Sequence, residues 1–235
     1  MLSDRDLNVL QRAETEAALF QSLRRLALSL GFDHFMYAAK VKLGGNVFEP
    51  TLSGYPPAWL ERYRSRNFAK IDPVLRHCET RLTPLVWRPE IFSSAAQQRF
   101  FEEARQFGLK SGVSFPVHGS QGEVALLSLS LDSDAPWVQR HIAKRMASGH
   151  LLACFAHEAM MRLVVAPAVN SVAPLTEREK ECLYWVGAGK NTAEIAQVLH
   201  VSEHTVVYHI RNTLHKFGVR SRLQAVLRAA ALGVI

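Results

Sequence analysis

The chain has 235 residues, of which 48% are hydrophobic and 21% are charged, a composition typical of a globular protein. No run approaches the roughly 18 to 20 apolar residues that a membrane-spanning helix needs. The charged start MLSDRDLNVLQRAE lacks the apolar segment of a secretory signal peptide. We therefore expect a cytoplasmic protein with no membrane partner. Three cysteines, Cys78, Cys154 and Cys182, are an odd number and lie far apart, so no disulfide framework is predicted.

The chain is basic, with a formal net charge of +7 and a pI of about 9.6. A basic protein often binds nucleic acid or another polyanion. The excess is spread out, because residues from Pro174 onward hold eight of the 28 Lys and Arg residues and five of the 21 Asp and Glu residues. Charge alone is therefore a weak argument for DNA binding.

The N-terminal part of the chain shows both helical and extended patterns. Helical apolar spacing predicts helices over residues 7–30, around Trp59 and Tyr63, and over residues 73–79, 94–107 and 136–163. Strands are predicted over residues 34–41, 47–52, 112–117 and 123–131, with turns at Gly44-Gly45-Asn46 and at HGSQG, residues 118–122. Helices flanking a mostly antiparallel sheet predict an α+β fold, an α-β-α sandwich.

A break follows at VVAPAVNSVAP, residues 164–174, which contains two prolines, small residues and no charge. This composition is typical of a linker. We expect an N-terminal domain over residues 1–164, a linker over residues 165–174 and a C-terminal domain over residues 175–235.

The C-terminal domain is predicted to be all-α, with four helices. Thr176 and Glu179 fit a capping box, in which each side chain satisfies a free backbone N–H group at a helix start. Asn191, with Glu194 three residues later, and Ser202 are expected to cap the second and third helices. The first helix is expected to end near residue 186, the third to cover residues 203–217 before Gly218, and the fourth to cover residues 222–232.

The second and third of these helices fit a helix-turn-helix pattern. Small Ala196 would let the two helices approach closely, opposite Val206. The apolar residues expected to face inward are Ile195, Val198 and Leu199 from the second helix, and Val201, Val206, Ile210, Leu214 and Phe217 from the third. The helix caps, the short turn, the small residue and the polar outer face all agree with a helix-turn-helix. A plain helical bundle would not require all four features.

The outer face of the third helix carries the side chains expected to contact DNA. Arg211 is the candidate for a bidentate contact to guanine, and Val207 and Tyr208 also point toward the groove. The residues expected to hold the phosphate backbone are Thr205, His209, Asn212 and Lys216, together with Lys190 before the second helix. One recognition helix buries little surface, so specific binding should need two half-sites and a dimer. The last helix, RLQAVLRAAALGVI, would pack on the domain core or pair with a second subunit.

A second motif lies in GYPPAWLERYRSRNFAKIDPVL, residues 54–75, where aromatic residues accompany a carboxylate. Trp59 and Tyr63 are four residues apart and would share one face of a helix. Asp72 precedes a proline, which disfavours helical geometry at Asp72 and favours a helix start after it. These residues are either core aromatics and a helix cap, or the wall and polar anchor of a small-molecule pocket.

The C-terminal stretch from Leu175 to Arg222 resembles the DNA-binding domain of LuxR-type transcription factors, with Glu179, Leu183 and Gly189 at signature positions. The N-terminal part resembles the acyl-homoserine-lactone-binding domain of quorum-sensing LuxR-type regulators. That second resemblance rests on six residues in the expected order and spacing: Trp59, Tyr63, Asp72, Pro73, Trp87 and Gly112. Together the two resemblances cover nearly the whole chain.

The resemblance implies roles for the residues of a lactone pocket. Trp59 would donate its indole N–H to the lactone carbonyl, and Asp72 would accept the amide N–H. Tyr55 and Ser128 would donate hydroxyl groups to the amide carbonyl. Tyr63 and Trp87 would wall the ring, near Phe100, Ala104 and Leu109, and the apolar residues for the acyl tail would be Met36, Ala38, Leu52, Val74, Cys78, Val124, Ala125 and Leu126. An ionised carboxylate only accepts hydrogen bonds, which suits an amide N–H.

The resemblance also implies the partners. From it we expect a homodimer that binds an N-acyl-homoserine lactone and a palindromic site in double-stranded promoter DNA. RNA polymerase is a further candidate partner. No cofactor, metal or catalytic residue is expected. The alternative is a regulator of the same architecture that responds to a different small molecule or acts without a ligand.

Other protein classes fit the sequence less well. The segment from Gly189 to Thr192 is similar to the end of a phosphate-binding loop, but Tyr184 occupies the position of the required earlier glycine. His150, Cys154 and His157 have helical spacing, but no further ligand pair with metal spacing follows. The first sixty or so residues also lack the alternating β-α pattern of a phosphorylated receiver domain.

Overall fold

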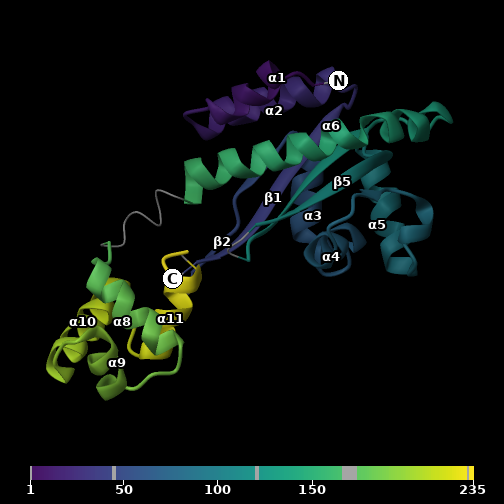
Figure 1. The fold of residues 1–235 in the computed structure, drawn as a ribbon. Coiled ribbons are helices and arrows are strands. Elements are labelled where there is room, and N and C mark those ends of the chain that lie inside the picture. Colours follow the sequence, from purple (N-terminus) through teal and green to yellow (C-terminus); the bar gives the residue numbers. More distant parts are fainter. Residues whose placement is uncertain (1, 44–45, 120–121, 166–173, 232) are drawn as a thin grey trace. The chain divides into compact units, whose positions relative to one another are not determined.

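The computed structural model describes residues 2–43, 46–119, 122–165, 174–231 and 233–235. The chain forms two compact units, an N-terminal unit of helices and strands and a C-terminal helical unit (Figure 1). Within the described residues, no helix combines the length and the apolar character needed to span a bilayer.

The N-terminal unit begins with two helices where the sequence predicted one. Helix α1 (Asp4–Gln11) starts at Ser3, and helix α2 (Glu16–Ser29) starts at Thr15, whose hydroxyl accepts the backbone N–H of Ala18. The apolar spacing continues across the break, so periodicity did not reveal it. The local signal for the second start is Thr15, a residue type that favours the N-cap position.

The described strands form one antiparallel sheet in the order β2-β1-β6-β5-β4, and β3 also pairs with β1. The strands are β1 (His34–Leu43), β2 (Asn46–Phe48), β3 (Thr51–Ser53), β4 (Leu85–Val86), β5 (Ser111–His118) and β6 (Val124–Leu131). The single strand predicted over residues 47–52 is interrupted near Pro50, which has no backbone N–H for a ladder. Residues 44–45 and 120–121 of the predicted turns lie outside the described residues.

Helices cover both faces of the sheet, which confirms the predicted sandwich (Figure 1). Helices α1, α2 and α6 (Trp137–Met160) pack together on one face, with α6 against β5 and β6. Helices α3 (Pro57–Ser65), α4 (Pro73–Thr80) and α5 (Ala95–Gln106) lie on the other face, with short 3₁₀ turns at Phe68–Lys70 and Pro89–Ile91. The helix predicted over residues 136–163 ends at Met160 and continues as a π-helical turn, Met161–Val165.

The pairing register decides which side chains face each helical layer. Leu127 pairs with Tyr37 on one side and Phe115 on the other, and these buried residues face α6. The next pair along these two strands joins Ser128 of β6 and Ser114 of β5. Because successive side chains of a strand point to opposite faces, these serines face the layer of α3, α4 and α5.

The C-terminal unit consists of helices α8 (Glu177–Gly187), α9 (Thr192–Leu199), α10 (Glu203–Phe217) and α11 (Arg222–Ala231). The predicted capping boxes at Thr176 and Asn191 are both present, and the Ser202 side chain accepts the backbone N–H of Thr205. Gly218 ends α10 with a φ of +62°, a left-handed conformation that glycine adopts without a Cβ clash. Residues 166–173 of the predicted linker and Leu232 lie outside the described residues.

The helix-turn-helix core follows the predicted pattern with one correction. Ile195 and Ala196 of α9 pack against Val206 and Ile210 of α10, all of them buried. Val198, which we expected to face inward, is 40% exposed. The apolar stripe of α9 passes through Ile195, Ala196 and Leu199, and Val198 lies at its outer edge.

Candidate functional site

Aromatic side chains from α3, the 3₁₀ turn after it and α5 gather on one face of the sheet. The buried ring of Trp59 lies 5.9 Å from the ring of Tyr63, and 5.8 Å from both the Phe68 and Phe100 rings, measured between centroids. Trp59 and Tyr63 thus share one helix face, as predicted. The sequence did not predict Phe68 and Phe107, whose rings also contact Trp59. Phe68 lies in a short turn and carries no periodic signal, whereas Phe107 caps α5 and follows Phe100 at helical spacing.

Asp72 connects this aromatic cluster to the start of α4. Its Oδ1 accepts the backbone N–H of Val74 at 2.8 Å, and its Oδ2 accepts the hydroxyl of Tyr63 at 2.9 Å. Asp72 is therefore both a helix cap and a carboxylate beside the aromatic rings. Each carboxylate oxygen has two lone pairs, so the group can accept a further N–H.

Burial raises the pKa values of these groups. It raises the pKa of Asp72 to about 6, because desolvation of the carboxylate outweighs the hydrogen bonds from Tyr63 and from the backbone of Val74 and Leu75. Burial also raises the pKa of Tyr63 and of Tyr55 above the ordinary tyrosine value. The two phenols therefore stay protonated near neutral pH, while Asp72 is mostly ionised there.

A second polar group lies on the sheet itself. The indole Nε1–H of Trp87 donates to Ser114 Oγ at 3.0 Å, and Ser114 Oγ lies 2.6 Å from Ser128 Oγ. The buried Tyr55 hydroxyl lies near the Ser130 and Ser128 hydroxyls, which lower its pKa and so offset part of the rise that burial causes. The resemblance pointed to Ser128 but not to Ser114, and only the cross-strand register brings the two serines together.

Gly112, a signature residue, allows Trp87 to lie against the sheet. The Trp87 backbone N–H donates to the Gly112 carbonyl at 2.8 Å. A Cβ added to Gly112 would stand 2.9 Å from the Trp87 ring and 2.7 Å from the backbone oxygen of Leu129. Both distances are shorter than van der Waals contact, so a side chain at this position would displace the indole.

The residues predicted for the acyl tail divide into two groups. Val74, Cys78 and Leu126 are buried in the same cluster as Trp59, together with Phe100, Ala104 and Leu109. Ala38 packs against it, and Met36 shares the Ser128 face by register. Val124 shares that face at the start of β6.

Ala125 and Leu52 are corrections to this set. Ala125 pairs with Ala39, and Leu52 pairs with Tyr37, so both residues lie on the sheet face that packs against α6. Consecutive side chains of a strand point to opposite faces, so Ala125 cannot share a face with both Val124 and Leu126.

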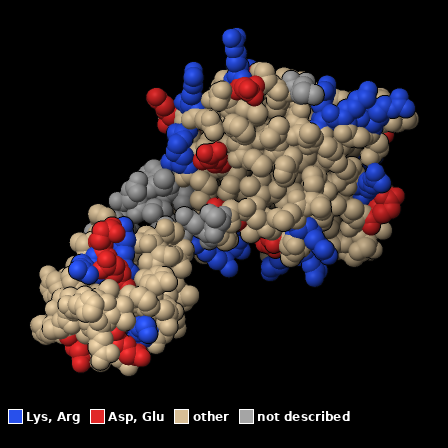
Figure 2. Space-filling model, in the orientation of Figure 1, with Lys and Arg blue, Asp and Glu red and all other residues tan. Residues whose placement is uncertain are grey.

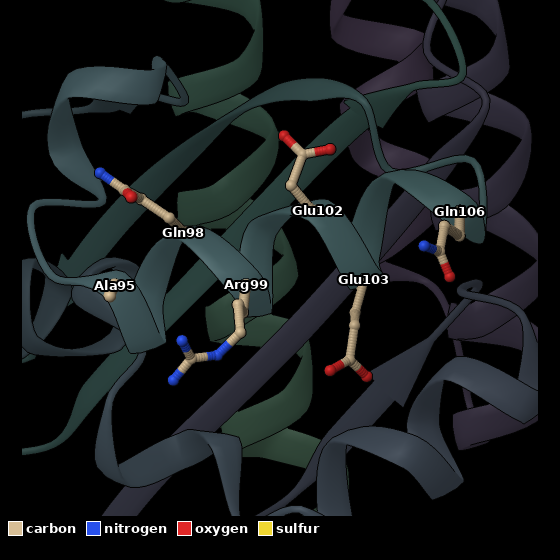
Figure 3. Close-up of a pocket in the computed structure, with 6 residues that line it drawn as sticks. All are labelled: Ala95, Gln98, Arg99, Glu102, Glu103 and Gln106. Atoms are coloured by element: carbon tan, nitrogen blue, oxygen red, sulfur yellow. The ribbon is translucent and has the colours of Figure 1, made fainter.

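A hollow of about 450 Å³ lies elsewhere, along the outer surface of α5. Its lining residues all come from α5, and Figure 3 shows Gln98 and Glu102 pointing to one side of the helix and Arg99 and Glu103 to the other. None of the predicted ligand residues lines this hollow. Among the described residues, no group of three or more His, Cys, Asp or Glu side chains could hold a metal ion.

The outer face of α10 presents the predicted DNA-contact residues. Val207 is 46% exposed and Tyr208 is 58% exposed, and Arg211 is exposed one turn later. Thr205, His209 and Asn212 are partly exposed on the flanks of this face. Figure 2 shows Lys and Arg side chains in several separate groups on the face in view, which agrees with the spread of charge along the sequence.

Lys216 has a structural role in addition to its predicted one. Its Nζ lies 2.7 Å from Glu179 Oε2 and 2.9 Å from the carbonyl oxygen of Pro174. Glu179 is only 3% exposed, so Lys216 balances a buried carboxylate at the start of α8. The ammonium of Lys190 instead lies 5.7 Å from the centre of the Trp185 ring, a cation–π distance.

Two family models match the chain and together account for both units. Residues 15–160 match the autoinducer binding domain, and residues 173–229 match the bacterial regulatory proteins of the luxR family. The chain therefore belongs to the LuxR-type transcriptional regulators with an autoinducer-binding domain. It is a ligand-responsive DNA-binding regulator of quorum sensing, and not an enzyme.

Known relatives support this assignment over nearly the full chain. The transcriptional activator SolR of Ralstonia nicotianae is 35% identical over 95% of this chain and 94% of SolR. The crystal structure of SdiA from Escherichia coli has a TM-score of 0.78 and 30% identity over 97% of this chain and 95% of that chain, and SdiA is also known in complex with octanoyl-rac-glycerol. CepR2 of Burkholderia cenocepacia, an N-acylhomoserine-lactone-dependent LuxR family factor, has a TM-score of 0.58 and 26% identity over 68% of this chain and 94% of that chain.

Proposed function

We propose that this protein binds an N-acyl-homoserine lactone in its N-terminal domain and a palindromic promoter site as a homodimer. The observation that carries the ligand assignment is the polar pattern beside the aromatic cluster. Asp72 supplies an acceptor, and Tyr55 and Ser128 supply hydroxyl donors. A secondary amide has one N–H and one C=O, so it matches this pattern with both groups satisfied.

The lactone ring would lie against the aromatic side chains. Trp59 is buried beside the Tyr63 ring, and its indole N–H would donate to the lactone carbonyl. Tyr63 and Trp87 would flank the ring, near Phe100, Ala104 and Leu109. The acyl tail would lie among Met36, Ala38, Val74, Cys78 and Leu126, which are apolar residues on the same face of the sheet or on α4.

Ligand binding would also stabilise the N-terminal domain. The rings around Trp59 contact one another, so a bound lactone would enlarge the aromatic core rather than attach to its surface. A ligand that binds only the folded state stabilises it by about 2.7 kcal/mol at a hundred times its dissociation constant. Such stabilisation links the ligand concentration to the amount of folded regulator.

Exposed leucines on α11 support the homodimer. Ala225 and Ala229 are buried against the domain core, whereas Leu223 is 67% exposed and Leu227 is 62% exposed. The last helix therefore packs on the core with one face and leaves two leucines, one turn apart, on another. A second copy covering these leucines would place two recognition helices on the two halves of a palindrome. RNA polymerase stays a candidate partner for the assembled complex.

The melting temperature of the purified protein with a panel of acyl-homoserine lactones tests the proposed ligand. We expect a rise that depends on chain length and that shrinks in Asp72→Asn. Asp6→Asn is the matched control, because Asp6 belongs to a capping box on α1 and should leave the rise unchanged.

The same panel tests the alternative ligand class. Octanoyl-rac-glycerol has no amide and no lactone ring, although its free hydroxyl groups can also donate to Asp72, so the comparison depends on which compound class raises the melting temperature of the parent chain. A shift with octanoyl-rac-glycerol alone, or no shift with any lactone from folded protein that binds DNA, would contradict the lactone assignment. It would favour a regulator of this architecture that responds to a different molecule or to none.

A further inference from the structure

We infer that Ser114 is a positioning residue of the ligand site, which orients the Ser128 hydroxyl as a donor toward a ligand carbonyl. The inference rests on the proposed function, because it concerns recognition of the same amide. Ser114 is fully buried and lies on the neighbouring strand, directly across from Ser128.

Trp87 fixes one end of this arrangement. The Trp87 backbone is bonded to Gly112, and its ring lies over Gly112. Ser114 is two residues further along β5, so it lies on the same face of the strand, where the indole N–H reaches its Oγ at 3.0 Å. The position of the indole is therefore set by backbone pairing rather than by the ligand.

The direction of the hydrogen bonds follows from what each group can do. An indole N–H can only donate, so Ser114 Oγ accepts from Trp87. The Ser114 hydroxyl hydrogen then needs an acceptor, and among the described residues its remaining partner is Ser128 Oγ, at 2.6 Å. The reverse order would leave the Ser114 hydrogen unpaired in a fully buried place, which costs about 1 to 3 kcal/mol.

When Ser114 donates to Ser128, the Ser128 hydroxyl hydrogen points away from Ser114. The buried Tyr55 hydroxyl lies near Ser128, on the same side of the sheet. Ser128 would therefore face the ligand as a donor that is already oriented, and it would favour a strong acceptor such as an amide oxygen. Without Ser114, the Ser128 oxygen would lose the hydrogen bond that it accepts, and the direction of its own hydroxyl hydrogen would no longer be fixed.

A pair of ligands that differ in one atom tests this role. The probes are N-octanoyl-homoserine lactone and its thioamide analogue, in which sulfur, a weaker acceptor, replaces the amide oxygen. The measured quantity is the ratio of their dissociation constants in the full chain. Comparing this ratio between variants cancels any effect of the sulfur on the neighbouring N–H, because Asp72 is present in all of them.

The parent should prefer the amide by about tenfold, the difference expected for one good hydrogen bond. Ser114→Ala should reduce the preference to about two- or threefold, and Ser114→Thr, which keeps the hydroxyl, should restore most of it. Ser111→Ala is the matched control, because Ser111 is also a buried serine of β5, bonded instead to the Ser133 carbonyl. It should leave the ratio unchanged.

A double-mutant cycle tests whether Ser114 acts on the ligand through Ser128. In a Ser128→Ala background, Ser114→Ala should no longer change the ratio, because the hydroxyl that it orients is absent. The Trp87 indole ¹H–¹⁵N resonance of the unliganded protein should shift in Ser114→Ala and return in Ser114→Thr, which also reports that the variants are folded.

Three results would overturn the inference. One is an equal loss of affinity for both probes in Ser114→Ala, which would mean that Ser114 only fills space. Another is an undiminished Ser114→Ala effect in the Ser128→Ala background. A parent chain that binds neither probe would instead refute the proposed ligand class, and with it the role of Ser114 in recognition. A shift of the Trp87 indole resonance in Ser114→Ala would even then show the hydrogen bond itself.

Discussion

At the scale of single residues, Asp72 combines the helix cap and the acceptor beside aromatic rings that the sequence offered as alternatives. It caps α4, it accepts the Tyr63 hydroxyl, and it keeps acceptor capacity beside the aromatic rings. Burial raises the pKa of Asp72 to about 6, so the carboxylate beside the aromatic rings is costly to ionise. An amide N–H would supply the missing partner for that charge.

This raised pKa makes the unliganded fold sensitive to pH. Because the folded-state pKa of about 6 exceeds the unfolded value of about 3.9, the stability contributed by protonated Asp72 is complete below about pH 4 and is lost as pH rises through about 6. Asp72→Asn cannot ionise, so its stability relative to the parent should increase over this interval, by about 1 to 3 kcal/mol. Urea unfolding at pH 4 and pH 7 measures the difference, and a constant difference would show that Asp72 is not desolvated.

At the scale of elements, the sequence predicted helix starts better than strand faces. Thr176, Asn191 and Ser202 mark their helices because capping is a local interaction between a side chain and the backbone next to it. The pairing of Ser114 with Ser128 depends on which strands become neighbours, and no local pattern encodes it. The face of Leu52 likewise follows from its pairing with Tyr37, whereas strand alternation alone separates Ala125 from Val124 and Leu126.

The candidate ligand residues were predicted by resemblance more than by physical pattern. The spacing of Trp59 and Tyr63 indicated one shared helix face, but core packing would explain that spacing equally well. The hydrogen bond between Tyr63 and Asp72 connects the two parts of the motif, and it depends on how the chain turns between residues 65 and 73. Phe68, within that turn, was missed.

Helix α10 gives a prediction about DNA recognition. Arg211→Ala should reduce discrimination between a preferred site and a site with a changed guanine by about 1 to 3 kcal/mol. Lys190→Ala should instead weaken binding to both sites equally and lower the salt slope by about one. Fluorescence anisotropy at several salt concentrations measures both effects. Arg178→Ala, an exposed arginine paired with Glu181 on α8, is the control, and unchanged discrimination in Arg211→Ala would refute the base contact.

The ion pair between α8 and α10 gives a prediction about stability. Lys216→Gln leaves the buried carboxylate of Glu179 without its cation, so we expect a loss of about 1 to 3 kcal/mol in unfolding of the C-terminal unit. Lys190→Gln removes an equal charge that lies beside the Trp185 ring rather than beside a buried carboxylate, and it should have a smaller effect. Thermal unfolding of each variant provides the comparison, and equal stability of the two would mean that Lys216 does not support the fold.

At the scale of the whole molecule, the candidate ligand residues and the candidate DNA-contact residues lie in different compact units, and we propose that regulation acts through assembly or through the amount of folded protein. The exposed leucines of α11 offer one contact for assembly. Leu223→Glu with Leu227→Glu should reduce affinity for a two-half-site duplex by about tenfold or more, toward that for a single half-site, because two charges would have to be buried together. Leu82→Glu, at a residue that is 66% exposed in the N-terminal unit, should not change this affinity.

The central claim is that a lactone controls sequence-specific DNA binding by this chain. Selection of sites from a pool of random duplex DNA by the purified protein, with and without its best-binding acyl-homoserine lactone, tests the claim directly. We expect a palindromic site to be enriched with the lactone, and much less so without it or with Asp72→Asn. Equal enrichment in all three conditions, or enrichment of single half-sites only, would contradict the account.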